Sequence, residues 1–176
     1  VVHGVGSYPK FDHHQGPSDI LLENSNGKFK DVTKKAGLFM EEHTTGVATA
    51  DFDNNGLQDL LVMRRGDLIH ENEALIYLNH GSSGFTHLNN HNVVSLELGA
   101  IGSGVETLDY NLDGRVDVIF GSERGKWHLY RNNVQATGNA AYIVVDVGSS
   151  SSEAATALGA LVTVEACSTE QVKRVG

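Results

Sequence analysis

Cysteine is nearly absent from this sequence, and its other scarce features exclude several classes of protein. Cys167 is the single cysteine, so no disulfide forms within the chain and zinc sites built on several cysteines are excluded. No apolar run reaches the roughly 20 residues of a membrane span, and the first residues show neither an initiator Met nor a signal-peptide pattern. Basic residues are also few, with 13 Lys and Arg against 22 Asp and Glu, which gives a net charge of -9. This acidity argues against nucleic acid and anionic lipid as partners.

Helical periodicity is scarce too, and short strand-like stretches take its place. Segments rich in β-branched and aromatic residues are bounded by Gly, Asn and Ser, a pattern typical of strands. Examples are GVATAD (46–51), DLLVM (59–63), ALIYLN (74–79) and GFTHLN (84–89). The exception is VTKKAGL (32–38), which predicts one helical turn that ends at Gly37. The fold class predicted from this pattern is all-β.

The sequence repeats itself. GVATADFDNNGLQDLLV (46–62) aligns with GVETLDYNLDGRVDVIF (104–120), so that Asp109 lies 58 residues after Asp51. LIYLNHGSSGF (75–85) is echoed by HLYRNN (128–133), and ILLENSNGKF (20–29) resembles the same element once more. Three copies of about 40 to 50 residues, with up to four strands each, favour blades of a β-propeller. The first copy is incomplete, and we expect the chain to begin just after an acidic loop.

Each of the two later copies carries a loop with the spacing D-x-D/N-x-N/D-G-x-x-D. Alternate side chains converge on one point while the glycine lets the backbone turn. Three carboxylates about 5 Å apart repel by roughly 3 kcal/mol per pair at an effective dielectric of ~20, and a divalent ion removes that cost. Hard oxygen ligands suit Ca²⁺. The sequence therefore predicts two calcium sites: the first from Asp51, Asp53, Asn55, the Leu57 carbonyl and Asp59, the second from Asp109, Asn111, Asp113, the Arg115 carbonyl and Asp117.

Two alternatives compete with this interpretation. An EF-hand needs a glutamate at loop position 12 and flanking helices, whereas Val62 and Phe120 stand there and strand formers follow. A pair of Asx turns without metal would also explain the acidic residues. Two loops in the same register favour calcium over plain turns.

The loops, with FKDVTKKAGL (29–38) as a linker, resemble the VCBS and FG-GAP repeats of integrin-α-like β-propellers, and more closely the cartilage acidic protein family. In that family such blades precede a small ASPIC/UnbV domain, whose first half NAAYIVVDVGSSSSEAATALGALVTVEACSTEQVKRVG (139–176) resembles. The resemblance implies a partial propeller of about three blades at 1–138, followed at 139–176 by part of a small β domain. Within the latter we expect strands at 142–147 and 159–166, joined by an exposed serine run at 149–152. The blades that complete the propeller would come from sequence outside this chain or from partner chains.

The function expected from these features is a calcium-binding, noncatalytic interaction, adhesion or matrix module that is secreted and works outside the cell. Millimolar extracellular calcium saturates even weak sites, and the partner would be an extracellular protein or a glycan. The clustered carboxylates are assigned to metal, and no Ser-His-Asp or Cys-His arrangement stands out, so we do not expect an enzyme. The alternative is a calcium-dependent propeller that binds or processes glycans.

Four further motifs have simpler explanations. His13 and His14 lie in a polar insert, where a solvated loop is favoured over a Cu²⁺ or Zn²⁺ site. The tripeptide Arg65-Gly66-Asp67 is favoured as a surface turn over an integrin-recognition signal. GAIGSG (99–104) lacks the Lys-Ser/Thr ending of a phosphate loop. Trp127 and Tyr130 are expected to pack between blades, in preference to forming a sugar-stacking platform.

Overall fold

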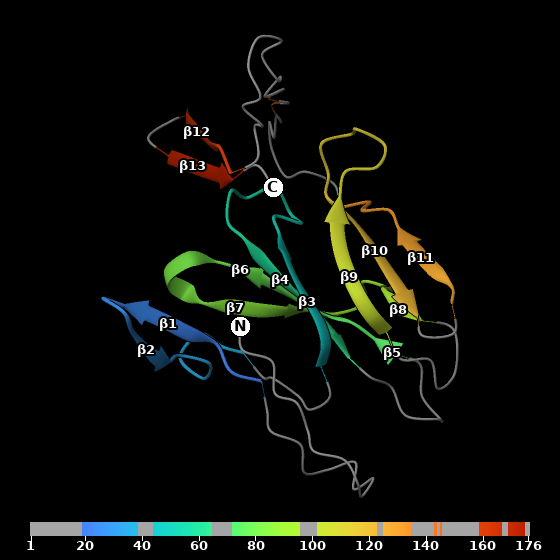
Figure 1. Ribbon diagram of the computed structural model, residues 1–176, viewed down its shortest axis with the longest axis horizontal. Coiled ribbons are helices and arrows are strands. Elements are labelled where there is room, and N and C mark those ends of the chain that lie inside the picture. Colours follow the sequence, from blue (N-terminus) through green and yellow to red (C-terminus); the bar gives the residue numbers. More distant parts are fainter. Residues whose placement is uncertain are drawn as a thin grey trace, which may run out of the picture. The chain divides into compact units, whose positions relative to one another are not determined.

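The structure is a computed structural model that describes residues 19–38, 44–64, 72–95, 102–122, 125–134, 143, 145, 159–166 and 169–174 (Figure 1). The chain divides into two compact units, residues 1–140 and 141–176. The described residues contain strands, turns and one 3₁₀ turn, but no α-helix. The fold is therefore all-β, as predicted, and its antiparallel sheets are open. The predicted propeller stays a proposal. Within the described part of the chain, no helix is long and apolar enough to cross a membrane.

Among the described residues, the first unit contains four antiparallel sheets or hairpins built from eleven strands. The largest is a meander in the order β3-β4-β6-β7, and a second meander has the order β9-β10-β11. β1 pairs with β2, and β5 pairs with β8. The bounds of the eleven strands are β1 Leu22–Ser25, β2 Lys28–Asp31, β3 Thr44–Ala50, β4 Asp59–Arg64, β5 Asn72–Glu73, β6 Leu75–Asn79, β7 Phe85–Leu88, β8 Val94–Ser95, β9 Gly102–Leu108, β10 Asp117–Ser122 and β11 Trp127–Tyr130. The 3₁₀ turn η1 lies at Gly81–Ser83.

The strands repeat in space as the sequence repeats along the chain. β3, β4 and β6 correspond to β9, β10 and β11, and the register agrees: Leu60 is opposite Tyr77, as Val118 is opposite Tyr130. β1 and β2 correspond to β6 and β7, since Asn24 pairs with Phe29 just as Asn79 pairs with Phe85. We refer to residues 20–31 as repeat 1, 44–88 as repeat 2 and 102–132 as repeat 3.

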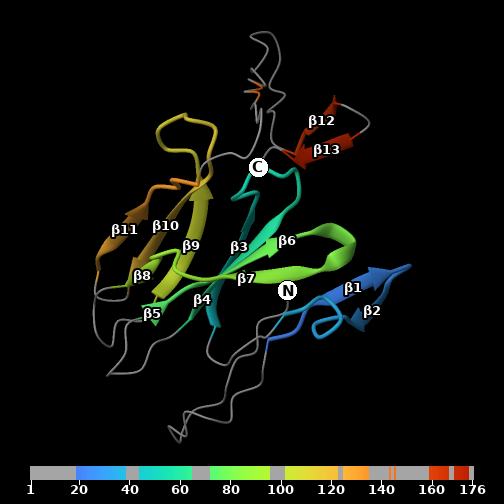
Figure 2. The same ribbon diagram turned by 180° about the vertical axis from the view of Figure 1, so that it is seen from behind.

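Strand β4 is buried on both faces because a different repeat covers each side. Leu61 and Met63 belong to a core cluster with Val118 and Phe120 of repeat 3. The alternate residues Leu60 and Val62 belong to a second cluster on the opposite face. The other members of the second cluster, including neighbours of repeat 1, are Leu38, Leu75 and Tyr77, with Leu21, Ala36, Val47 and Phe85 at its edge. β3 and β9 lie side by side in both views (Figures 1 and 2). Neighbouring repeats therefore stack face to face.

The predicted helical turn at 32–38 is present and joins repeat 1 to repeat 2. Ala36 N–H donates to the Val32 carbonyl at 2.8 Å, and Leu38 N–H reaches back to the Thr33 carbonyl at 3.1 Å. Gly37 has φ +79°, the left-handed residue expected at such an end. A Cβ on Gly37 would lie 2.7 Å from the Phe85 carbonyl oxygen, so glycine also permits the close contact with β7.

Trp127 does not pack between repeats. Its side chain is 76% exposed, while Tyr130 is half-buried and stacks on Phe120 with ring centroids 5.7 Å apart. The sheet face that carries Trp127 has no neighbour among the described residues, so the expected packing of Trp127 between repeats is not seen within this chain. Tyr130 points to the other face, which repeat 2 covers.

The second unit contains an antiparallel hairpin of β12 Leu161–Ala166 and β13 Thr169–Arg174. The strand predicted at 159–166 is present, whereas β13 was not predicted. Of the segment 142–147 the structure describes only Ile143 and Val145, which are not in a strand. The serine run 149–152 lies outside the described residues, as do His13, His14 and Arg65-Gly66-Asp67, and of 99–104 only the last three residues are described.

Candidate metal centre

The two acidic loops occupy matching places, between β3 and β4 and between β9 and β10. Each loop turns through two left-handed residues at the same positions. In the first loop these are Asn54 (φ 57°) and Gly56 (φ 88°), and in the second they are Leu112 (φ 57°) and Gly114 (φ 79°). Glycine and asparagine tolerate this conformation, but leucine does so at a cost. The shared glycine of the motif is therefore needed by the turn itself.

The first aspartate of each loop holds the turn closed. Asp51 accepts hydrogen bonds from the Asn55 N–H at 3.0 Å and the Gly56 N–H at 2.8 Å. Asp109 accepts the equivalent bonds from Asp113 at 3.0 Å and Gly114 at 2.8 Å. These contacts satisfy backbone donors that the tight turn would otherwise leave without partners.

The last aspartate of each loop is a buried anchor. The side chains of Asp59 and Asp117 are both 0% exposed. The two Asp59 oxygens accept the N–H groups of Phe52 and Asn79, each at 2.7 Å. Asp117 accepts those of Tyr110 at 3.2 Å and Asn132 at 2.7 Å. Each carboxylate therefore connects the start of its own loop to a later strand of the same repeat: Asp59 to the end of β6, and Asp117 to the residues just after β11.

The asparagine at that strand end was not among the predicted site residues. The Asn79 side-chain amide donates to the Gln58 carbonyl at 2.9 Å, and the Asn79 backbone carbonyl accepts the Asn55 side-chain amide at 3.0 Å. Asn132 donates to the carbonyls of Val116 at 3.2 Å and Phe52 at 2.8 Å, so it also joins the two loops. The signal was present in the sequence, since IYLN (76–79) and LYRN (129–132) match.

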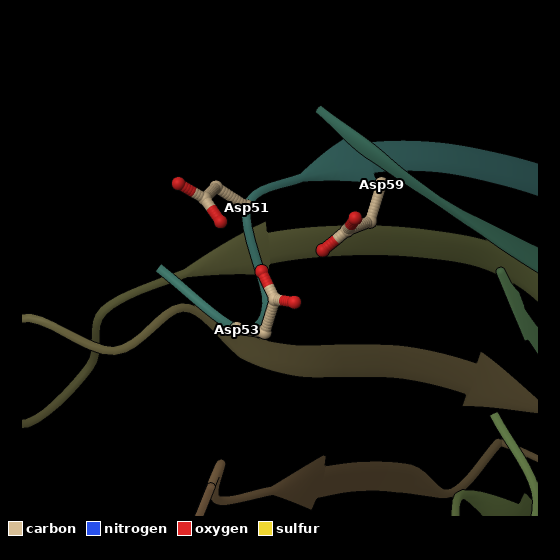
Figure 3. A group of neighbouring side chains, drawn as sticks. All are labelled: Asp51, Asp53 and Asp59. Atoms are coloured by element: carbon tan, nitrogen blue, oxygen red, sulfur yellow. The ribbon is translucent and has the colours of Figure 1, made fainter. Parts of the chain in front are cut away.

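In the first loop the three carboxylates come together (Figure 3). Ligand oxygens of Asp51, Asp53 and Asp59 all lie within 4.8 Å of one another, where β3 ends and β4 begins. Burial raises the pKa of Asp51 and of Asp59, and the neighbouring carboxylates raise both further, against the backbone hydrogen bonds that lower them. Within the described part of the chain, this is the one group of three such acidic, His or Cys side chains. The loop concentrates negative charge at a partly buried point.

The remaining predicted ligands of the first loop take part in local turns. Asn55 donates its side-chain amide to Asp53 at 3.1 Å, and its side-chain oxygen accepts the Leu57 N–H at 2.8 Å. The equivalent position of Leu57 is Arg115, whose N–H donates to Asp113 at 3.1 Å. Leu57 and Arg115 therefore occupy the same place in the two turns.

The second loop balances its charge in a different way. The Asp113 carboxylate forms ion pairs with the guanidinium groups of Arg115 and, at 3.0 Å, Arg131. It also accepts the Asn111 side-chain amide at 2.9 Å. Partial burial acts to raise the pKa of Asp113, but these hydrogen bonds and the arginines outweigh it and lower the pKa. The structure therefore brings Asn111 and Asp113 together as expected, but directs two cationic side chains toward the second loop.

Protein-family models, curated proteins and solved structures were compared with the chain, and none of them matches it. The chemistry of the loops is therefore the main guide to function.

Proposed function

We propose that this chain is a calcium-stabilised, noncatalytic interaction module that works outside the cell, with its metal held chiefly by the first acidic loop. The observation that carries the proposal is the group of Asp51, Asp53 and Asp59 oxygens within 4.8 Å of one another. Carboxylate and amide oxygens are the ligands that Ca²⁺ prefers. Burial and, to a smaller extent, the neighbouring carboxylates raise the pKa of Asp51 and Asp59, and a bound cation would offset this cost of keeping them charged.

The residues of the first loop fit such an ion. Each carboxylate oxygen has more than one acceptor position, so an oxygen that accepts one backbone N–H keeps capacity for a cation. No lysine or arginine is paired with Asp51, Asp53 or Asp59 among the described residues. The neighbouring Asn55 and the Leu57 carbonyl are oxygen donors of the same hard type. When bound, calcium would supply positive charge and hold the turn.

The second loop is proposed as a weaker site. Arg115 and Arg131 already neutralise Asp113, and a calcium ion would have to compete with these two guanidinium groups for the carboxylate. Asp109 and Asp117 remain oxygen donors. The two loops thus offer the same spacing of ligands with different charge compensation.

The proposed role of the ion is structural. Asp51 and Asp59 hold backbone N–H groups of the turn and of β6, so a cation bound between them would fix the connection between two core strands. An ion at 100 times its dissociation constant adds about 2.7 kcal/mol to stability. The clustered carboxylates accept backbone N–H groups and would bind the ion, so we propose no catalytic role for them.

The stacked repeats support the finer proposal that they are blades of an open propeller of the VCBS/FG-GAP type. Repeats 1, 2 and 3 share one strand register and stack face to face. The resemblance implies an extracellular location, where millimolar calcium would saturate even a weak site. The partner of the module would be an extracellular protein or glycan.

Isothermal titration calorimetry of the chelator-treated protein with CaCl₂ tests the proposal. We expect one tighter binding event, which is lost in Asp53→Asn and kept in Asp113→Asn, and much weaker heat with MgCl₂. Absence of calcium heat for the unchanged protein, with coincident melting curves in calcium and chelator, would show that the loops are acidic turns without a metal.

A further inference from the structure

The outer face of repeat 3 is an apolar surface that has no neighbour among the described residues. This terminal face is defined by residues that point away from repeat 2 on β9, β10 and β11: Leu108, Ile119, Trp127 and Leu129. Trp127 is 76% and Leu129 50% exposed. Large apolar side chains gathered on one side of a sheet are uncommon on a free surface.

The internal repeat identifies what such a face does. Each residue of the terminal face matches a residue of repeat 2 that is buried in the core against repeat 3. Trp127 and Leu129 match Ala74 and Ile76, which are 0% and 4% exposed. The remaining matches of the terminal face are Leu108 with Ala50 and Ile119 with Leu61, and the adjoining Tyr110 and Gly121 match Phe52 and Met63. The matching face of repeat 2 is therefore an interface between repeats.

The terminal face is also shaped to receive side chains. Trp127 lies over Gly121, where the glycine has no side chain and the indole carbons come within 3.6 to 3.8 Å of a Cβ position. A hollow of about 420 Å³ opens beside them, lined by Ile119, Glu106 and Lys126 among others. In repeat 2 the position of Gly121 is filled by Met63, which is fully buried. In repeat 3 the space beside Gly121 can therefore receive a side chain of another molecule.

Repeat 1 presents the opposite half of the same kind of interface. Phe29 matches Phe85, which packs against the cluster between repeats 1 and 2, but Phe29 is 67% exposed. Leu22 matches Tyr77, a buried member of that cluster, and lies on the same face as Phe29. We call Leu22 and Phe29 the leading face. Among the described residues, each of these two faces lacks a covering sheet, and the two faces are of the two kinds that meet between neighbouring repeats.

We propose that the terminal face of one chain binds the leading face of a second copy of this chain, head to tail. The contact continues the interface that already joins repeat 1 to repeat 2 and repeat 2 to repeat 3. The two surfaces differ, so the association is heterologous and propagates the stacking of repeats from one chain to the next. It depends on the repeat geometry and not on the proposed calcium site.

Sedimentation velocity over a range of protein concentration tests this proposal. The unchanged protein should sediment faster as concentration rises. Leu129→Asp, on the terminal face, and Phe29→Asp, on the leading face, should each sediment as the 18.9 kDa monomer. Both positions are exposed, so the variants should keep the circular dichroism spectrum of the parent. Leu161→Asp is the matched control, because Leu161 is 61% exposed and lies in the hairpin of the second unit, outside both faces, and it should associate like the parent.

Mixing the two monomeric variants gives the deciding result. Leu129→Asp retains the leading face and Phe29→Asp retains the terminal face, so an equimolar mixture should form a 1:1 dimer. An unchanged protein that stays monomeric at every concentration would overturn the proposal. It would also be overturned by a mixture that stays monomeric, or by a Phe29→Asp variant that associates alone, since the terminal face would then bind itself.

Discussion

Replacing Asp53 by asparagine should change stability in opposite directions with and without calcium. Asp53 lies within 4.8 Å of the ligand atoms of Asp51 and Asp59; burial raises the pKa of both, and the charge of Asp53 raises it further. At that separation two like charges repel by about 0.9 kcal/mol at the dielectric constant of water, and by about 3.5 kcal/mol at an effective dielectric constant of ~20. Asp53 is half-exposed, so the lower value applies, and the two pairs together cost about 2 kcal/mol.

In chelator the Asp53→Asn variant removes this repulsion. It also loses the hydrogen bond from the Asn55 side-chain amide, at 3.1 Å, which is worth about 0.5–1 kcal/mol. The net result should be a gain of about 1 kcal/mol, or a melting temperature about 3 °C higher. In saturating calcium the sign should reverse. At free calcium of about 100 times the parent's dissociation constant, a hundredfold loss of affinity removes about 2.3 kcal/mol of binding stabilisation, so the variant ends about 1 kcal/mol less stable than the parent.

Asp113→Asn is the control for this experiment, because it makes the same chemical change in the second loop. There the carboxylate is paired with Arg115 and Arg131 and its pKa is lowered, so neutralising it should lower the melting temperature slightly both in chelator and in calcium. Asp59→Ala would be a poor test. It leaves two buried N–H groups without acceptors and costs stability whether or not metal is present. Calorimetric melting curves of the Asp53 variant that shift the same way in calcium and in chelator would refute the assigned role of Asp53.

Three further outcomes follow from the same loops. In chelator, acidification from pH 7 toward about 4.5 should raise the melting temperature. The reason is that Asp51 and Asp59 have folded pKa values above the ordinary 3.8, so the folded protein takes up protons before the unfolded chain does. In calcium, the same acidification should lower the melting temperature, because protonation displaces the metal. Opposite slopes in the two buffers confirm this, and parallel slopes contradict it. Leu112→Asn should stabilise the protein by about 1 kcal/mol in thermal melts, because Leu112 is left-handed and exposed, and the converse change Asn54→Leu should destabilise it by a similar amount. Arg131→Gln should strengthen calcium binding by the second loop about tenfold in calorimetric titration, and unchanged affinity would show that the arginine does not compete.

The sequence was sufficient for features that depend on neighbours along the chain. The helical turn ends at Gly37 because the left-handed residue of that turn is local. The positions of both acidic loops between strands followed from the spacing of Asp, Asn and Gly, and the all-β class followed from short β-branched segments and the lack of helical periodicity. Turn chemistry and strand patterning act over a few residues, so they can be read without knowledge of the fold.

Only the tertiary structure decided what each acidic side chain contacts. Asp59 and Asp117 appeared equivalent to the other acidic residues, yet each is a buried anchor for an asparagine on a later strand. Asp113 is neutralised in part by Arg131, 18 residues away along the chain. Ile76 is buried, whereas its counterpart Leu129 in the next repeat is exposed. The difference depends on whether another sheet lies over that face. Burial and charge compensation arise from residues that are distant in sequence, and only the folded arrangement of the strands brings those residues together.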